Sequence, residues 1–446
     1  MKRRVFFSSA ASAAALTGLP GCSGDVKESK QITPPDELVT TNGRLGGKTL
    51  EELRGRYHAD LFDDYIPFLY KYVVDREYGG FMCTTDRDGT NLDTNKRAWF
   101  EGRGTWVSSF LYNKLDPDPE HLEVAKKSVE FVLQLLPKDP DSFFPMGMTR
   151  EGKPLTWTSD VYGDLFVATG LQEYSRAVKD DSYWQLAKEL MLKCLRLYDR
   201  PDYGKSVNGS KAMATLGQRY LGHWMIFIRL CSQMLADRDD PEVQAVIDRC
   251  LEAILDHHLN PEFGMMNEEL PHDMVRKEGE PYNSISLGHG TETLWMVFYE
   301  ALRRGDRALY ERAAKVFKRQ VEVSWDDVYG GAFMSLTVGD DQMCYGTSKS
   351  LWLQEEVLIG TMFMVEHFGD EWAKHWYEKV YTYVLDKYPL KQYGYPIWIL
   401  YADQKVTFEE HTNRVGNFHH PRHLMLNLLS IDRMIERGGK ISNKLM

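Results

Sequence analysis

The chain has 446 residues, of which 43% are hydrophobic and 27% charged, with a formal net charge of -11 at pH 7. This composition allows a large buried core and is typical of a globular protein rather than a disordered one. The acidic balance, with no Lys/Arg block beyond the extreme N-terminus, argues against nucleic acid as a partner. We therefore expect a small, neutral substrate.

The N-terminus resembles a targeting segment. Basic residues precede a Ser/Ala-rich, weakly apolar run, and Arg3-Arg4 is similar to a twin-arginine signal. The run ends at Cys22 in a sequence similar to a lipobox, although Pro20 is unusual there, so a poorly packed tail with a chance cysteine is the alternative. We expect an exported periplasmic or cell-envelope lipoprotein that meets a membrane only through a lipid on Cys22. Residues 1–22 would be the signal peptide and 23–48 a flexible tether.

A weak pattern recurs along the rest of the chain: an aromatic residue beside a glycine, followed by a few extended residues. Successive aromatics lie 59 to 66 residues apart, a period typical of a repeat architecture. Turn residues follow several copies, so each copy predicts a short β-hairpin. The six aromatics are Tyr78, Phe144, Tyr203, Phe263, Tyr329 and Tyr393.

Between these hairpins, apolar residues recur at helical spacing. The predicted helices are 97–113, 119–136, 158–177, 181–198, 211–237, 240–258, 286–304, 306–323, 347–368 and 370–387. A further helix near 50–74 and another near 421–437 would pair and close a ring. The sequence therefore predicts an all-α fold, a single (α/α)6 barrel over residues 49–440. An open solenoid is the alternative, but it would leave two apolar ends that need caps.

Polar residues stand in the apolar stretches 20 to 27 positions after a hairpin aromatic. They are Arg103, His223, His289, Trp352, Glu356 and His419. In a closed barrel these positions share one level of the lumen. We therefore expect them to converge on one pocket.

Four blocks in this order are similar to those of the N-acylglucosamine 2-epimerase family. They are Trp99-Phe100-Glu101-Gly102-Arg103, Gly288-His289-Gly290-Thr291-Glu292, Trp352-Leu353-Gln354-Glu355-Glu356 and Phe418-His419-His420-Pro421-Arg422. The resemblance runs from about residue 50 to 437. It implies an (α/α)6 barrel and a cofactor-independent sugar 2-epimerase or aldose–ketose isomerase. N-acylglucosamine is the favoured substrate, with N-acylmannosamine as product.

The resemblance makes His289 and His419 the catalytic pair; His419 is preferred to His420 because the family pattern is Phe-His-x-Pro-Arg. Inversion at C2 of an open-chain aldose removes a proton next to the carbonyl and returns one on the other face. Imidazole suits both steps because its pKa is near ~6.5.

Four further residues are predicted to bind the substrate or orient the histidines. Arg103 would stabilise the charge on the carbonyl oxygen, although it could instead form a structural ion pair. Glu292 and Glu356 would orient the imidazoles or a hydroxyl. Trp352 would stack on the sugar; the alternative is that it packs in the hydrophobic core. Its neighbour Leu351 replaces an aromatic residue that many family members carry.

Other sequence signals are weaker. His223 is a candidate substrate contact because some family members carry a histidine there. Residues 46–49 resemble the end of a phosphate loop but lack its first glycine. His419 and His423 are spaced like a metal pair, but Pro421 suggests that His419 precedes the helix, so we expect no metal and no cofactor.

Two rival functions and the oligomeric state stay open. One rival is a secreted glycoside hydrolase of the same barrel, using Glu292, Glu356 and Asp164 as acids and bases. The other is a non-catalytic sugar-binding lipoprotein. Both a monomer and a homodimer are compatible with the sequence.

Overall fold

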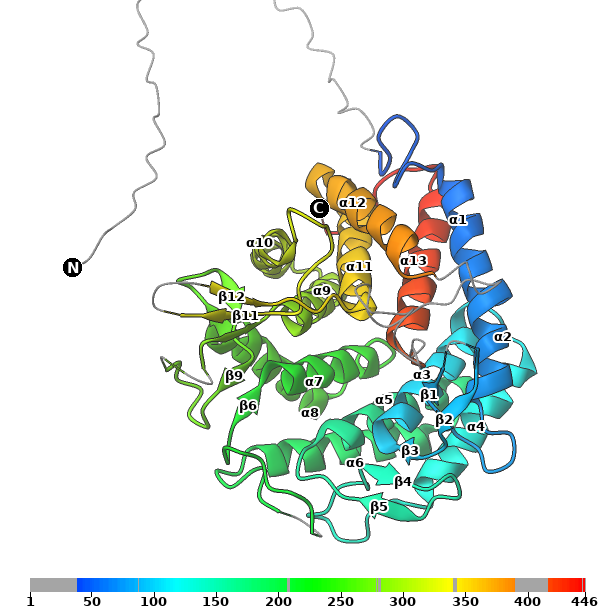
Figure 1. Cartoon of the computed structure of the whole chain (residues 1–446), viewed down its shortest axis with the longest axis vertical. Helices are drawn as coiled ribbons and strands as arrows, with labels where there is room; N and C mark the ends of the chain where they lie inside the picture. The colour runs from blue at the N-terminus through cyan, green and yellow to red at the C-terminus, as the bar shows by residue number, and fades with distance from the viewer. Residues whose placement is uncertain are drawn as a thin grey trace, which may run out of the picture. The chain divides into compact units, whose positions relative to one another are not determined.

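The computed structural model describes residues 38–389 and 416–445, apart from 87, 207–208, 278, 280–281, 340–342 and 443. In this part of the chain, helices alternate between an inner and an outer ring (Figure 1). The inner helices are α3 (Ala98–Lys114), α5 (Tyr162–Val178), α7 (Leu221–Met234), α9 (Leu287–Arg304), α11 (Leu351–Phe368) and α13 (His419–Glu436). Each inner helix packs against the next, and α13 packs against α3, so the ring closes. The predicted (α/α)6 barrel is confirmed.

The outer helices pack against this ring. They are α1 (Leu50–His58), which continues through η1 (Ala59–Tyr65), α2 (Ile66–Phe68) and η2 (Leu69–Val73); α4 (Pro119–Leu133); α6 (Asp181–Tyr198); α8 (Pro241–Glu252), which continues as η3 (Ala253–His258); α10 (Arg307–Ser324); and α12 (Glu371–Lys387). In the outer helices α4, α6, α8, α10 and α12, an aspartate caps the N-terminus by accepting a hydrogen bond from a backbone N–H. These caps repeat with the barrel: Asp118, Asp180, Asp240, Asp306 and Asp370.

Short antiparallel sheets connect outer helices to the inner helices that follow them. Two sheets have three strands: β3 (Lys96–Arg97), β4 (Gly147–Met148) and β5 (Pro154–Thr156); and β10 (Ser284–Ser286), β11 (Ser335–Val338) and β12 (Met343–Gly346). Three have two strands: β1 (Thr84–Thr85) with β2 (Asn91–Asp93), β6 (Arg219–Tyr220) with β9 (Glu269–Leu270), and β7 (Leu259–Asn260) with β8 (Met265–Met266). Because β3, β6 and β10 run directly into α3, α7 and α9, their sheets fix how the first turns of these helices enter the lumen.

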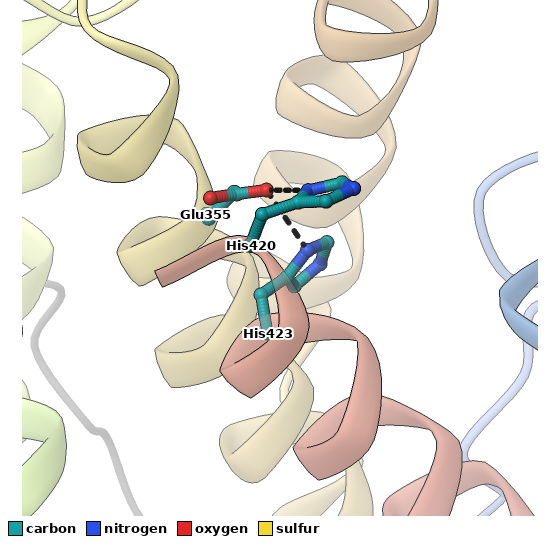
Figure 2. A group of neighbouring side chains, drawn as sticks. All are labelled: Glu355, His420 and His423. Atoms are coloured by element: carbon teal, nitrogen blue, oxygen red, sulfur yellow. Dashed lines mark hydrogen bonds and ion pairs between the residues drawn. The ribbon is translucent and has the colours of Figure 1, made fainter. Parts of the chain in front are cut away.

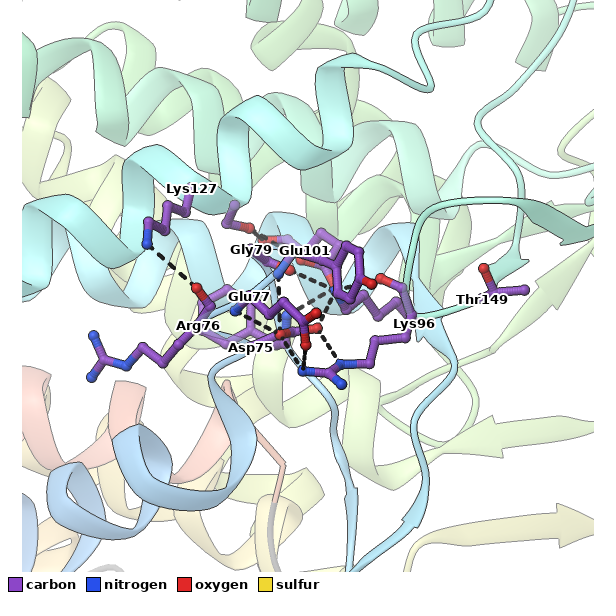
Figure 3. Close-up of polar contacts among 12 residues, drawn as sticks. Asp75, Arg76, Glu77, Gly79, Lys96, Glu101, Lys127 and Thr149 are labelled. Atoms are coloured by element: carbon purple, nitrogen blue, oxygen red, sulfur yellow. Dashed lines mark hydrogen bonds and ion pairs between the residues drawn. The ribbon is translucent and has the colours of Figure 1, made fainter.

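A buried ion pair anchors β3 just before α3 (Figure 3). Lys96 Nζ lies 2.9 Å from Asp75 Oδ2, and both side chains are fully buried. The same ammonium donates to the carbonyl oxygens of Gly79, at 2.6 Å, and Arg150, at 2.8 Å. Arg150 in turn pairs with Asp75. Removal of Asp75 would leave the Lys96 ammonium buried without a counter-ion, so this network holds the start of α3 firmly in place.

The first and last helices of the described barrel meet as predicted from the repeat. Helix α1 packs beside α13, and Asn427 Nδ2 donates a 3.1 Å hydrogen bond to the hydroxyl of Tyr57. Residues 38–48, assigned to the tether from sequence, instead lie against the barrel: Val39 is buried and its N–H donates to Gly439 O at 2.9 Å. Residues 1–37, and the hairpin predicted around Tyr393, lie outside the described residues.

Several predicted helix starts differ from the structure, and two of these differences have a clear physical reason. The helix predicted from 211 begins at Leu221, because Arg219 and Tyr220 pair with β9 and Gly217 adopts a positive φ of 74°. Helix α13 begins at His419 rather than near Pro421, with Phe418 as N-cap. Proline is accepted in a first helical turn because its missing N–H would have no partner there. In the described part of the chain, no helix has the length and apolarity needed to cross a membrane.

Candidate functional site

A cavity of about 550 Å³ lies where the first turns of five inner helices meet the hairpin loops. Its wall includes five of the residues predicted from sequence: Arg103, His289, Glu292, Trp352 and His419. The repeat spacing therefore placed Arg103, His289, Trp352 and His419 correctly at one level of the lumen, whereas Glu292 was predicted from the family resemblance. Glu356 and His223 are not part of the wall.

His289 lies in the first turn of α9, where the Ser286 hydroxyl accepts its backbone N–H at 3.1 Å. Its Nδ1 lies 2.9 Å from Glu268 Oε1, and the two groups form an ion pair. Burial alone would lower the pKa of His289, but the Glu268 carboxylate outweighs burial and raises it to about 9. The imidazole is therefore charged at neutral pH, with Nε2 as the ring nitrogen left for a substrate.

His419 is the first residue of α13, and its Nδ1 lies 2.8 Å from Glu356 Oε1. The indole Nε1–H of Trp295 donates to the other oxygen of Glu356 at 2.7 Å, which fixes the carboxylate. Burial lowers the pKa of His419 well below its usual value. The ring is therefore neutral. Its Nδ1 lies near both Glu356 and, at 3.1 Å, the Arg422 guanidinium; the hydrogen bond to Glu356 requires the proton on Nδ1, which leaves a lone pair on Nε2.

Trp352 lies against both imidazoles. Its ring centroid is 5.8 Å from that of His289 and 5.1 Å from that of His419. A glycine is required opposite it, because a Cβ at Gly288 would come within 2.4 Å of Trp352 Cη2. The predicted role in stacking on a sugar is compatible with this position on the cavity wall.

The Arg103 guanidinium packs among aromatic rings, 4.1 Å from the centroid of Phe166 and 4.5 Å from that of Trp99. It donates to the hydroxyl of Tyr162 at 3.0 Å. Its Nε is buried and has no hydrogen-bond partner in the described residues. A structural ion pair between Arg103 and Glu101, one form of the alternative role of Arg103, is not formed, since that carboxylate accepts bonds from Phe81 N and Ser128 Oγ. The Arg103 cation is therefore part of the cavity wall, and one of its donors is unused.

Arg422 holds the two carboxylates predicted from sequence. Its Nη2 lies 2.6 Å from Glu292 Oε1 and 2.5 Å from Glu356 Oε1, and all three side chains are almost completely buried. The hydrolase alternative needs free carboxylates. Here both are ion-paired, and Asp164 bonds to Lys193 and to the backbone N–H of Phe144 outside the cavity wall.

His223 lies beside the main cavity, in a cluster of tyrosine rings. Its ring centroid is 5.3 Å from those of Tyr198 and Tyr220 and 6.2 Å from that of Tyr162. It lines a separate space of about 130 Å³, which shares Tyr162 and Trp99 with the main cavity. Burial lowers the pKa of His223 to about 4, so the ring is neutral.

The structure adds site residues that the sequence analysis did not assign. Arg422 is the last residue of the block from Phe418 to Arg422 that is similar to the family, so the resemblance could have identified it. Glu268 belongs to a short acidic run after Phe263, where no local pattern distinguishes it from Glu269. Tyr162, Glu355 and His420 also line the cavity.

Two groups of side chains offer metal-ligand atoms within 4.8 Å of one another in the described residues. One comprises Glu292, Glu356 and His419, but the Arg422 guanidinium already supplies its positive charge. The other comprises Glu355, His420 and His423. That group contains no arginine.

Comparison with known proteins identifies similar chains and similar folds. The family model described as N-acylglucosamine 2-epimerase matches residues 79–422. The N-acylglucosamine 2-epimerase of Bos taurus is 25% identical over 406 residues, which cover 87% of this chain and 94% of the bovine one. Cellobiose 2-epimerase of Bacillus thermoamylovorans B4167 has a similar structure, with a TM-score of 0.72 at 15% identity, covering 86% of this chain and 100% of that one. The structure of a D-mannose isomerase is also similar, with a TM-score of 0.69 at 13% identity, covering 90% of this chain and 100% of that one.

Proposed function

Since the chain belongs to the N-acylglucosamine 2-epimerase family and is an enzyme of the isomerase class, we propose that it inverts C2 of an open-chain aldose by proton transfer between His289 and His419. The favoured substrate is N-acylglucosamine, converted to N-acylmannosamine. The family model and the bovine relative support this choice.

One observation carries the proposal: two imidazoles, one charged and one neutral, line one cavity and both lie against Trp352. Each has its Nδ1 fixed by a carboxylate, Glu268 for His289 and Glu356 for His419. Each therefore presents Nε2 to a substrate. Carboxylate–imidazole pairs of this kind set the tautomer and the ring orientation that general acid–base catalysis needs.

The proposed step balances in protons and charge. His419 Nε2 takes the proton from C2, and the electron pair of the C–H bond moves onto the carbonyl oxygen at C1. The Arg103 guanidinium stabilises the resulting enolate oxygen. His289, already protonated, then delivers a proton to the opposite face of C2. The reverse reaction uses the histidines in the opposite order.

The test follows hydrogen at C2. The purified full chain would be incubated in deuterated water with N-acetylglucosamine, glucose, mannose or cellobiose, and the products followed by NMR. Deuterium at C2 together with the C2 epimer supports the proposal. A ketose product would show that the proton returns to C1 instead of C2. The enzyme would then be an aldose–ketose isomerase. Cleavage of cellobiose, or no reaction with any sugar, would contradict the proposed chemistry.

A further inference from the structure

Beside the cavity, but outside the machinery assigned above, lies the second group of metal-ligand side chains. Glu355 is on α11, and His420 and His423 are one turn apart on α13. Figure 2 shows both imidazoles turned toward the same carboxylate. Oε1 of Glu355 lies 2.5 Å from Nδ1 of His420 and 3.5 Å from Nδ1 of His423. We propose that Glu355, His420 and His423 bind a divalent first-row transition-metal ion, with zinc as the ion of best-matched chemistry.

The chemistry of the three donors fits such an ion. Two imidazoles and one carboxylate form the protein ligand set of many zinc sites that keep a position open. On a tetrahedral zinc ion, neighbouring ligand atoms lie about 3.4 Å apart, given bond lengths of ~2.0–2.1 Å. The separation between Glu355 and His423 already matches this, and all the donor atoms lie within 4.8 Å of one another. A side-chain rotation that opens the contact between Glu355 and His420 would complete the set.

His423 provides a second, independent indication. Its side chain is 3% exposed, and its Nδ1 has no hydrogen-bond partner in the described residues. Nε2 is 3.0 Å from the hydroxyl of Tyr57. With the proton on Nε2, the Nδ1 lone pair faces a carboxylate oxygen. A cation between them would satisfy both groups.

The surroundings hold His423 in this orientation. Besides His423, the Tyr57 hydroxyl contacts Asn427 Nδ2 at 3.1 Å and the Tyr377 hydroxyl at 3.0 Å. Partners of this kind fix the tautomer of a metal-binding histidine.

Two of the three proposed ligands border the cavity, although all three residues are almost completely buried. Glu355 and His420 are part of the cavity wall, whereas His423 lies behind them. A water molecule or a substrate oxygen could therefore occupy the remaining coordination position. This arrangement differs from the pair His419 and His423 considered from sequence, because His419 bonds to Glu356 instead.

The test uses metal binding rather than turnover. The purified full chain, stripped with EDTA and dialysed, would be titrated with Co²⁺ and then with Zn²⁺. We expect one Co²⁺ per chain, with visible d–d absorption of a site with nitrogen ligands, and displacement of that absorption by Zn²⁺. Glu355→Gln and His423→Gln should each weaken binding at least about tenfold.

His367→Gln is the matched control. Like His423, His367 is buried beside a carboxylate, that of Glu366, and bonds to a hydroxyl group, that of Ser442. It should retain full binding. Circular dichroism in EDTA would establish that each variant is folded. A wild-type chain that takes up neither ion would overturn the proposal, and so would binding that survives both ligand substitutions.

Discussion

Nδ1 of His289 lies 2.9 Å from Oε1 of Glu268, a residue 21 positions earlier in the chain. The carboxylate keeps the imidazole protonated, since it raises the pKa of His289 to about 9 against the effect of burial. His289 should therefore act as an acid up to about pH 9. Activity should fall as the pH rises through that value.

Glu268→Gln tests this link. Without the carboxylate, burial should lower the pKa of His289, so the alkaline fall in activity should move to lower pH. At neutral pH the rate should drop about 10- to 100-fold. A pH–rate profile measures both effects, with Glu262→Gln on an exposed turn as control. An unchanged alkaline limb would show that His289 is not the group that titrates.

Replacing either catalytic histidine with Asn should reduce turnover by about 10²- to 10⁴-fold with little change in folding. The two variants should differ in isotope exchange. With the favoured substrate, His289→Asn keeps the proposed base, His419, and should still exchange the C2 hydrogen with deuterated water, whereas His419→Asn should not. With the product sugar the two results should be reversed. Full activity in both variants would end the two-histidine mechanism.

Gly288→Ala tests the position of Trp352. The added Cβ would lie 2.4 Å from Trp352 Cη2, so the indole must move away from the two histidines. We expect a loss of roughly 10- to 100-fold in kcat/KM because small displacements of positioning groups are costly. Tryptophan fluorescence would report the movement.

Gly163→Ala is the control for that substitution. Gly163 is also a helical glycine, and a Cβ there makes only an ordinary contact of 3.5 Å with Ala98. Its activity should be close to that of the wild type. Equal losses in both variants would mean that the effect arises from the helix rather than from Trp352.

Arg422→Leu should destabilise the fold. The substitution would leave Glu292 and Glu356 buried without their cation, a change that typically costs about 3–5 kcal/mol of unfolding free energy. Urea unfolding measures it. Arg54→Ala, which removes a partly exposed pair with Asp432, should cost only about 0–1 kcal/mol. Similar costs for the two variants would contradict a special role for Arg422.

The lipid anchor proposed at Cys22 can be tested by cell fractionation. In the native host, Cys22→Ser should move the protein from the membrane fraction to the soluble one, because the acylated side chain would be lost. A wild-type protein that is already fully soluble would refute the anchor.

The sequence by itself determined the fold and the level of the site. Helical periodicity and the recurrence of hairpins are local properties, so they predicted the ring of helices and the convergence of Arg103, His289, Trp352 and His419 on one cavity, to which the family resemblance added Glu292. The prediction of helix was wrong at residues 211–220. There the local helical pattern was overridden by pairing of Arg219 and Tyr220 with a strand from the next repeat.

Only the tertiary structure decided which groups pair. Glu355 and Glu356 are adjacent in sequence, yet one faces His420 and the other faces His419. Successive helical residues point about 100° apart, and the rotation of α11 against α13 is set by packing between segments more than 60 residues apart. The same long-range packing chose Glu268 for His289 and placed Arg422 between two carboxylates. Spacing along the chain contains no information on such pairings, because they depend on how whole helices dock.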